Sequence, residues 1–302
     1  MFSKGWCALL LCSFLFIFTT GCEKEVDLKL NSGASKIVVE GGIENGSPPL
    51  IVLTKSISYF SKIDLASLED AFIHNASIQV SDGSGTISLR EYSIDTGGQG
   101  NKFYFYSIDT ANPASFGFLG VSGKDYHLRI DVDGKQYTAS TRIPAFRTLD
   151  SFWYGAPDVL PKDVPGARLL YIRYTDPDTL GNSTRFFTKR NSEPYYPGVN
   201  SVFNDEVING TAISVSIPSG YDKSKAPKLD SLGYVFVGDT VTLRWSAIDR
   251  ATYDFWSTLE FSTGSVGSPF STPIQVAGNI SGGALGVWAG YGSQYRTIVI
   301  KP

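Results

Sequence analysis

The stretch that decides the fold reads YHLRIDVDGKQYTAST and occupies residues 126–141. Leu128, Ile130 and Val132 alternate with polar residues, so they fall on one face of a β-strand. Asp133-Gly134 is a typical two-residue hairpin turn. The pattern predicts an antiparallel hairpin with one buried face.

The same period of two recurs upstream of this hairpin. Short apolar alternations are separated by turn residues, as in Asp82-Gly83-Ser84-Gly85, and only residues 65–72 suggest a short helix. Strands with this spacing are typical of an antiparallel sandwich, and we expect an immunoglobulin-like β-sandwich domain over residues 36–147. The alternating pairs are Ile37 and Val39, Leu50 and Val52, Ile78 and Val80, and Ile87 and Leu89.

The second half of the chain, residues 148–302, reads as another β-rich domain, either a sandwich or a partial barrel. On one strand Leu243 and Trp245 fall on one face and Arg244 on the other. Apolar residues at helical spacing predict a single packed helix near residues 247–261, with Ser246 as its cap. The expected strands span residues 169–174, 184–189, 213–217, 233–237, 240–245 and 296–300.

The N-terminus carries the features of a bacterial lipoprotein signal. Lys4 precedes an apolar run that is shorter than the about 20 residues of a membrane span, and Thr20-Gly21-Cys22 follows it. We therefore expect residues 1–21 to be a signal peptide that is removed, Cys22 to be acylated, and residues 22–35 to be a flexible lipidated tether. Cys22 is the single cysteine of the mature chain, which leaves no intramolecular disulfide.

Composition argues against several functional classes. Removal of residues 1–21 takes away Lys4 and no acidic residue, which leaves 25 basic and 29 acidic residues, so nucleic acid is not an expected partner. The chain contains no metalloprotease, nucleophile-elbow, phosphate-loop or paired-cysteine motif. His74 and His127 are expected to be structural. We expect no catalytic residues, no metal and no cofactor.

Two groups of residues leave alternatives open. Asp131-Val132-Asp133 and Asp176-Pro177-Asp178 resemble fragments of calcium loops, but turn formation explains them better because the remaining ligands do not follow. The aromatic side chains of Tyr195 and Tyr196 are candidates for stacking on a glycan or peptide ligand, whereas core packing is the ordinary role of aromatic residues in β proteins.

The segment before the last strand is punctuated by proline and glycine, with Pro269 and Pro273 followed by Gly278-Asn279-Ile280 and Gly282-Gly283. It resembles the end of domain-of-unknown-function family 4249, a family of Bacteroidota lipoproteins. Its residues serve a buried turn or a partner surface equally well. Shorter matches lie at Cys22-Glu23-Lys24, residues 38–41, residues 76–80, Asp176-Pro177 and Gly238-Asp239. The motif residues are Gly278, Asn279, Ile280, Gly282, Gly283 and Gly286.

The resemblance implies a two-part β architecture, attachment to the outer membrane through the N-terminal lipid, and work beside a TonB-dependent receptor without catalysis. Glu23, Lys24 and Glu25 also resemble the surface-export signals of lipoproteins in that phylum, so the protein is expected to face the cell exterior. Three functions follow as hypotheses: an accessory or ligand-capture partner of the receptor, a structural or assembly lipoprotein of the outer membrane, and a glycan- or peptide-cleaving enzyme with two carboxylates.

Lipid attachment at Cys22 is directly testable. We expect mass spectrometry of the N-terminal peptide to show an acylated Cys22, and Cys22→Ser to release the protein or leave it unprocessed. An unmodified peptide that begins elsewhere would rule out the anchor.

Overall fold

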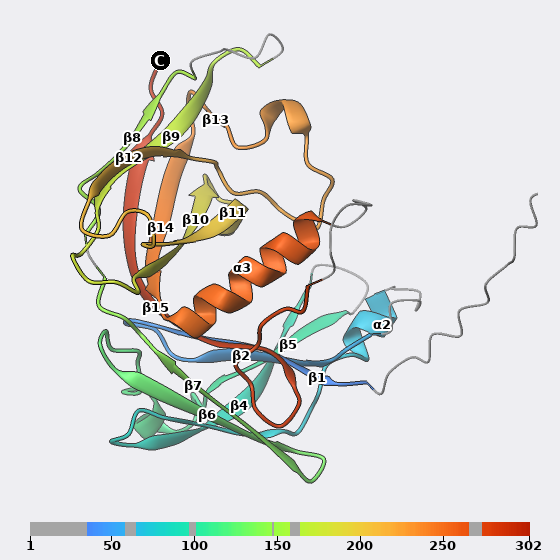
Figure 1. Cartoon of the computed structure of the whole chain (residues 1–302). Coiled ribbons are helices and arrows are strands. Elements are labelled where there is room, and N and C mark those ends of the chain that lie inside the picture. Colours follow the sequence, from blue (N-terminus) through green and yellow to red (C-terminus); the bar gives the residue numbers. More distant parts are fainter. Residues whose placement is uncertain (1–34, 58–64, 97–100, 147, 158–163, 266–273) are drawn as a thin grey trace, which may run out of the picture. The chain divides into compact units, whose positions relative to one another are not determined.

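In the computed structural model strands are the main secondary structure of the described residues, and their arrangement is all-β and sandwich-like with one long helix (Figure 1). The structure describes residues 35–302, which form one compact unit, apart from residues 58–64, 97–100, 147, 158–163 and 266–273. Residues 1–34, which include the predicted signal, Cys22 and most of the tether, lie outside the described part.

The strands before the predicted boundary near residue 147 are β1 to β7, and those after it are β8 to β15. In chain order the first set is β1 (Ile37–Glu44), β2 (Leu50–Lys55), β3 (Ser77–Ser81), β4 (Thr86–Asp95), β5 (Lys102–Ile108), β6 (Asp125–Val132) and β7 (Lys135–Arg142). The second set is β8 (Ser151–Gly155), β9 (Ala167–Thr175), β10 (Ser183–Arg190), β11 (Tyr196–Asn204), β12 (Ala212–Ile217), β13 (Val235–Phe236), β14 (Thr240–Ile248) and β15 (Leu285–Val299). The helices are α2 (Leu65–Glu69) and α3 (Arg250–Gly264).

An 11-stranded sheet connects both halves of the sequence in the order β11-β10-β14-β15-β1-β2-β5-β4-β3-β6-β7. The last strand lies in its middle. Residues 285–291 of β15 pair in parallel with β1, and residues 291–299 pair antiparallel with β14. Strand β15 comes from the second set in sequence, but it pairs with strands of both sets and so joins them.

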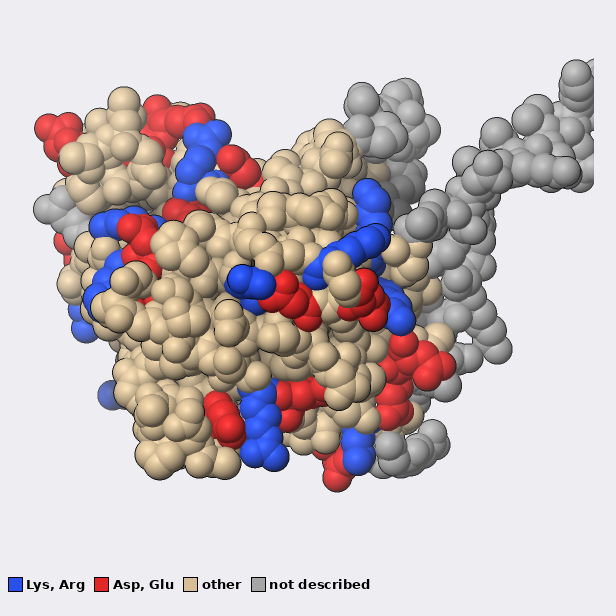
Figure 2. Space-filling view, turned by 90° about the horizontal axis from the view of Figure 1, so that it is seen from below, with Lys and Arg blue, Asp and Glu red and all other residues tan. Residues whose placement is uncertain are grey.

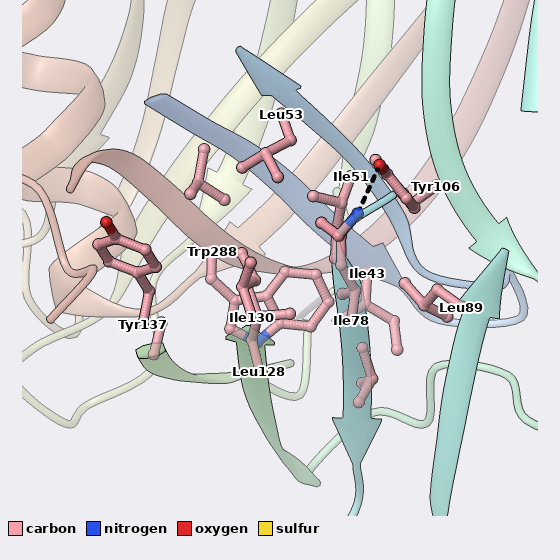
Figure 3. Close-up of a cluster of buried hydrophobic side chains, with 14 of the residues drawn as sticks. Ile43, Ile51, Leu53, Ile78, Leu89, Tyr106, Leu128, Ile130, Tyr137 and Trp288 are labelled. Atoms are coloured by element: carbon pink, nitrogen blue, oxygen red, sulfur yellow. Dashed lines mark hydrogen bonds between the residues drawn. The ribbon is translucent and has the colours of Figure 1, made fainter. Parts of the chain in front are cut away.

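The first core fills the space between β1 and β2 on one side and β3, β6 and β7 on the other. The predicted hairpin is confirmed as β6 and β7, with Asp133 and Gly134 in the turn at φ values of 50° and 71°. Trp288 of β15 is fully buried here, and its indole Nε1 donates to the Tyr126 carbonyl at 3.1 Å. Figure 3 shows Trp288 beside Leu128 and Ile130 of the hairpin.

The second core lies between the large sheet and a smaller one. The smaller sheet has the order β12-β9-β13, with β8 paired to β9. Leu170 and Ile172 of β9 face Leu243 and Trp245 of β14, all of them buried. The alternation expected for β14 is confirmed, because Arg244 lies on the opposite face of this strand.

Helix α3 packs on the other face of the large sheet, against β11, β15 and β10 (Figure 1). It begins three residues later than predicted, because residues up to Ile248 still pair with β15. The cap is Asp249 rather than Ser246: its carboxylate accepts the Thr252 N–H at 2.8 Å. Its second oxygen accepts from the Thr141 hydroxyl at 2.6 Å, which ties the helix start to β7.

Strand β15 also begins earlier than predicted, at Leu285 instead of residue 296. Its glycines made this stretch read as a loop, but they allow other backbone segments to approach closely. A Cβ on Gly290 would lie 2.2 Å from the Arg142 carbonyl oxygen, and one on Gly292 would lie 2.2 Å from that of Pro144. Glycine is therefore what lets the strand pass beneath the end of β7.

Replacement of the buried Trp288 tests the importance of this shared strand. We expect Trp288→Ala to lower the free energy of unfolding by about 3–5 kcal/mol, because it leaves a large cavity and an unpaired Tyr126 carbonyl. Chemical denaturation followed by circular dichroism would measure it. The control Trp153→Ala, at a ring that is 38% exposed and stacked on Tyr171, should cost about 1 kcal/mol. Similar losses in the two variants would contradict the assignment of Trp288 to the core.

Candidate functional site

A cleft of about 780 Å³ lies where the two halves of the large sheet meet α3. This volume is in the range that small-molecule sites occupy. Strands β1, β2, β5 and β15 contribute one part of its lining, and β10, β11, β14 and α3 contribute the rest. Its side chains include Glu40, Glu44, Leu50, Val52, Phe103, Arg185, Phe187, Arg244, Trp256, Val287 and Tyr291.

The floor of the cleft follows from alternation along β1. Val39 and Ile43 are buried in the first core, so Glu40, Gly42 and Glu44 face the other way. Their partners on β2 are Val52 for Glu40 and Leu50 for Gly42. Leu50 is 47% exposed, which leaves an apolar surface open to solvent at this side of the cleft.

The wall of the cleft contains a buried arginine stacked on aromatic rings. Arg185 is 4% exposed, and its guanidinium carbon lies 3.3 Å from the centre of the Trp256 ring and 4.5 Å from that of Phe187. Such stacking stabilises a cation through the faces of the rings. It leaves the edge of the guanidinium, where the N–H groups are, available for hydrogen bonds.

Few partners occupy that edge. Nε of Arg185 donates to the Ser201 hydroxyl at 3.2 Å, and Nη1 donates to the Tyr291 hydroxyl at 3.3 Å. Within the residues that the structure describes, Arg185 has no carboxylate at ion-pair distance. Burial lowers the pKa of Arg185, with the nearby Tyr291 and Glu260 acting against this, and a guanidinium still keeps its charge at neutral pH.

The neighbouring charges are already paired with each other. Glu260 of α3 accepts the Ser201 N–H at 2.8 Å and the Ser201 hydroxyl at 2.5 Å, and it lies 3.8 Å from Lys223. Since the same Ser201 hydroxyl accepts from Arg185, Glu260 positions the guanidinium through one intervening side chain.

A second ion pair closes one side of the cleft. Arg244 binds Glu44 with 2.7 Å between Nη2 and Oε2, and both side chains are largely buried. The Tyr295 hydroxyl donates to the other oxygen of Glu44 at 2.5 Å. Burial and the Glu44 carboxylate raise the pKa of Tyr295, so its hydroxyl remains protonated. Glu44 is thus held in place as a structural acceptor.

Two carboxylate residues of the described part of the chain line the cleft. Glu40 and Glu44, the carboxylate residues that line the cleft, are four residues apart on one strand, so their backbone positions are about 13 Å apart at about 3.3 Å per residue. Glycosidase pairs are separated by about 5–10 Å. In the part of the chain that the structure describes, no group of three or more His, Cys, Asp or Glu residues is placed to hold a metal ion.

The C-terminal motif is built into the fold. Asn279 pairs twice with Trp288: its Oδ1 accepts the Trp288 N–H at 2.9 Å, and its Nδ2 donates to the Trp288 carbonyl at 2.8 Å. Ile280 packs against the first core. A Cβ on Gly278 would lie 2.7 Å from the Gly286 carbonyl oxygen, so these two motif residues touch backbone to backbone.

The remaining motif glycines place the segment against β7 and β1. Gly282, Gly283 and Gly286 have φ values of 77°, 84° and 104°, which favour glycine. A Cβ on Gly282 would lie 2.8 Å from the Gln136 carbonyl oxygen, and one on Gly286 would lie 1.9 Å from that of Val39. The motif residues therefore do not line the cleft.

The structure does not bring Tyr195 and Tyr196 to one site. The Tyr195 ring contacts the Tyr295 ring with 5.9 Å between centroids, close to the Glu44 and Arg244 pair. Tyr196 begins β11 and lines a separate recess of about 300 Å³. From Tyr196 onward the chain forms strand β11, and Pro197 of this strand borders the cleft.

Other residues from the sequence lie outside the cleft. His74 binds Glu91, and His127 contacts the Ser140 hydroxyl at 2.8 Å. Asp131 accepts from Arg129 and Gln136 beside its hairpin turn. Cys22, Glu23, Lys24 and Glu25 fall outside the described residues.

Sequence reasoning missed Arg185, Phe187, Trp256 and Tyr291 as site residues. Arg185 and Phe187 are two apart on β10, so they share a face, and a cation beside an aromatic ring on one face was the available signal. Alternation cannot show that α3 covers this face, because the helix is about 65 residues further along the chain.

The fold and site define an all-β, sandwich-like protein with a ligand-sized cleft. Among the described residues, no helix is long and apolar enough to cross a membrane. The family model for a domain of unknown function (DUF4249) matches residues 23–297, and the chain belongs to this family. A comparison with curated proteins finds no match.

Two glycines of the motif provide a matched test of its structural role. Gly283→Ala should cost about 1–2 kcal/mol, because φ is positive but a Cβ meets nothing within 4 Å. Gly286→Ala should cost a further about 1–3 kcal/mol, because its Cβ collides with the Val39 carbonyl in the β1 pairing. Thermal unfolding of the two variants would measure the difference. Equal losses would show that backbone approach at Gly286 is not limiting.

Proposed function

We propose that this protein is a non-enzymatic outer-membrane lipoprotein, anchored through Cys22 and facing the cell exterior, that captures a ligand in the cleft for a TonB-dependent receptor. The observation that carries the proposal is the cleft itself. It combines the apolar side chains of Leu50 and Val52 with the buried Arg185, which stacks on aromatic rings. Such a combination is typical of small-molecule binding sites.

The arrangement of charges supports capture over catalysis. Glu44 is occupied by Arg244 and Tyr295, and Glu40 is about 13 Å away along β1, at about 3.3 Å per residue. The two histidines lie elsewhere, and each has a side-chain partner. Glu44 is therefore held as a structural acceptor and is not free to act as a general acid or base.

The charged surface is consistent with a partner other than nucleic acid. Figure 2 shows acidic and basic side chains side by side on the face seen from below, with uncharged areas between them. Several ion pairs are exposed, such as Arg142 with Asp125 and Arg250 with Asp254. An extended basic surface of the type that binds phosphates does not occur on this face.

Affinity purification of the native lipoprotein from mildly solubilised outer membranes tests the partnership. We expect a TonB-dependent receptor to co-purify, and Cys22→Ser to abolish its recovery from the membrane fraction. Absence of any receptor with the unmodified protein, together with envelope defects on deletion of the gene, would favour the structural or assembly function.

A variant that fills the cleft tests whether the cleft holds the ligand. Leu50→Trp should reduce the amount of small molecule that remains with the purified protein in native mass spectrometry, because the larger ring occupies the open apolar side. The control Leu180→Trp changes a leucine that is 76% exposed and outside the cleft lining, and it should retain the ligand. Equal retention in the two variants would place the ligand elsewhere.

A further inference from the structure

We propose that the cleft recognises a carboxylate carried on an apolar body, with the Arg185 guanidinium as the anchor of the carboxylate. This inference rests on the proposed function, because it takes the cleft as the ligand site. It adds the chemical class of the ligand and the residue that selects it.

The pairing of charges around Arg185 carries the argument. Arg244 and Glu44 line the cleft together with Arg185, whereas Lys223 and Glu260 lie outside its lining. Glu44 is paired with Arg244, and Glu260 lies near Lys223 and accepts twice from Ser201. One positive charge at Arg185 is left without a carboxylate of its own among the described residues.

A buried charge without a partner is unfavourable, and an incoming anion would offset that cost. The guanidinium has five N–H donors in a planar fork, and the described residues accept from two of them, on Nε and Nη1. Among the described residues these bonds go to the Ser201 and Tyr291 hydroxyls, and neither of them involves Nη2. A carboxylate matches the geometry of such a fork with two parallel hydrogen bonds.

The rest of the lining indicates what bears the carboxylate. Leu50, Val52 and Phe103 line the cleft with apolar side chains, and Leu50 and Val52 are adjacent on the sheet face opposite the first core. One guanidinium without a carboxylate partner favours a singly charged ligand over a phosphate, which carries close to two negative charges at neutral pH. Glu40 at the exposed end disfavours a second anionic group.

The test compares three probes that share one alkyl chain: dodecanoate, dodecanamide and dodecyl phosphate. Isothermal titration calorimetry would use the unlipidated mature chain with Cys22→Ser, so that no detergent is needed. We expect the unmodified cleft to bind dodecanoate at least about tenfold more tightly than dodecanamide, the effect of a hydrogen bond to a charged group. Dodecyl phosphate should bind no more tightly than dodecanoate.

The variant Arg185→Met removes the charge but keeps an apolar stem between the rings. It should bind the acid and the amide equally, and its melting temperature should not fall, because apolar replacements of buried charges are often neutral or stabilising. A lower melting temperature with an unchanged preference for the acid would make Arg185 structural and overturn the proposal. Arg129→Met, at a guanidinium that is 54% exposed on β6, is the matched control and should keep the preference.

A second measurement needs no variant at Arg185. The carboxyl resonance of ¹³C-labelled dodecanoate bound to the protein reports its protonation as pH changes, and a neighbouring guanidinium should hold the pKa of the bound acid below its free value. A raised pKa would overturn the proposal, as would equal affinity for acid and amide or tighter binding of the phosphate. Any of these results overturns the carboxylate preference and leaves the proposed function, ligand capture for a receptor, standing. Loss of receptor co-purification alone overturns the proposed function and leaves the carboxylate preference standing.

Discussion

The pairing of β15 with β1 on one side and β14 on the other is the interaction on which the rest of the structure depends. The chain completes the first core only when its last strand returns to lie parallel to its first, with Leu285–Tyr291 beside Val38–Glu44. Such a contact joins residues about 250 positions apart, and its loop-closure entropy is compensated by the buried Trp288 and the Asn279 hydrogen bonds. Pairings between such distant residues are typical of slowly folding proteins.

The cleft exists because of this pairing. Its floor comes from strands of the first half of the sequence, and its wall comes from β10, β14 and α3 of the second half. Tyr291 occupies the residue of β15 where the pairing passes from β1 to β14, and its hydroxyl accepts from both Trp256 and Arg185. A change in the pairing of β15 at Tyr291 would therefore alter the hydrogen bonding of the Arg185 guanidinium.

Local patterns predicted much of this fold and little of its site. The hairpin at residues 126–141 was readable because alternation and a glycine turn agree with each other, and the helix was readable from its apolar spacing. The start of β15 was not, since glycines at 286, 290 and 292 are required by backbone contacts from distant segments. The burial of Arg185 was likewise not predictable from its strand. Its side chain becomes buried only because Trp256 of α3 packs over it.

The family motif and the cleft are formed by different residues, so family membership says little about the ligand. Asn279, Gly282 and Gly286, the specific part of the resemblance, fix the return of β15 and touch backbone and core. Arg185 and Trp256 lie in segments that those motifs do not include. The motif secures the pairing of β15 with β1, whereas Arg185 lies on β10, outside both strands. The fold therefore follows from the family, whereas the chemistry of the ligand has to be read from the charges inside the cleft.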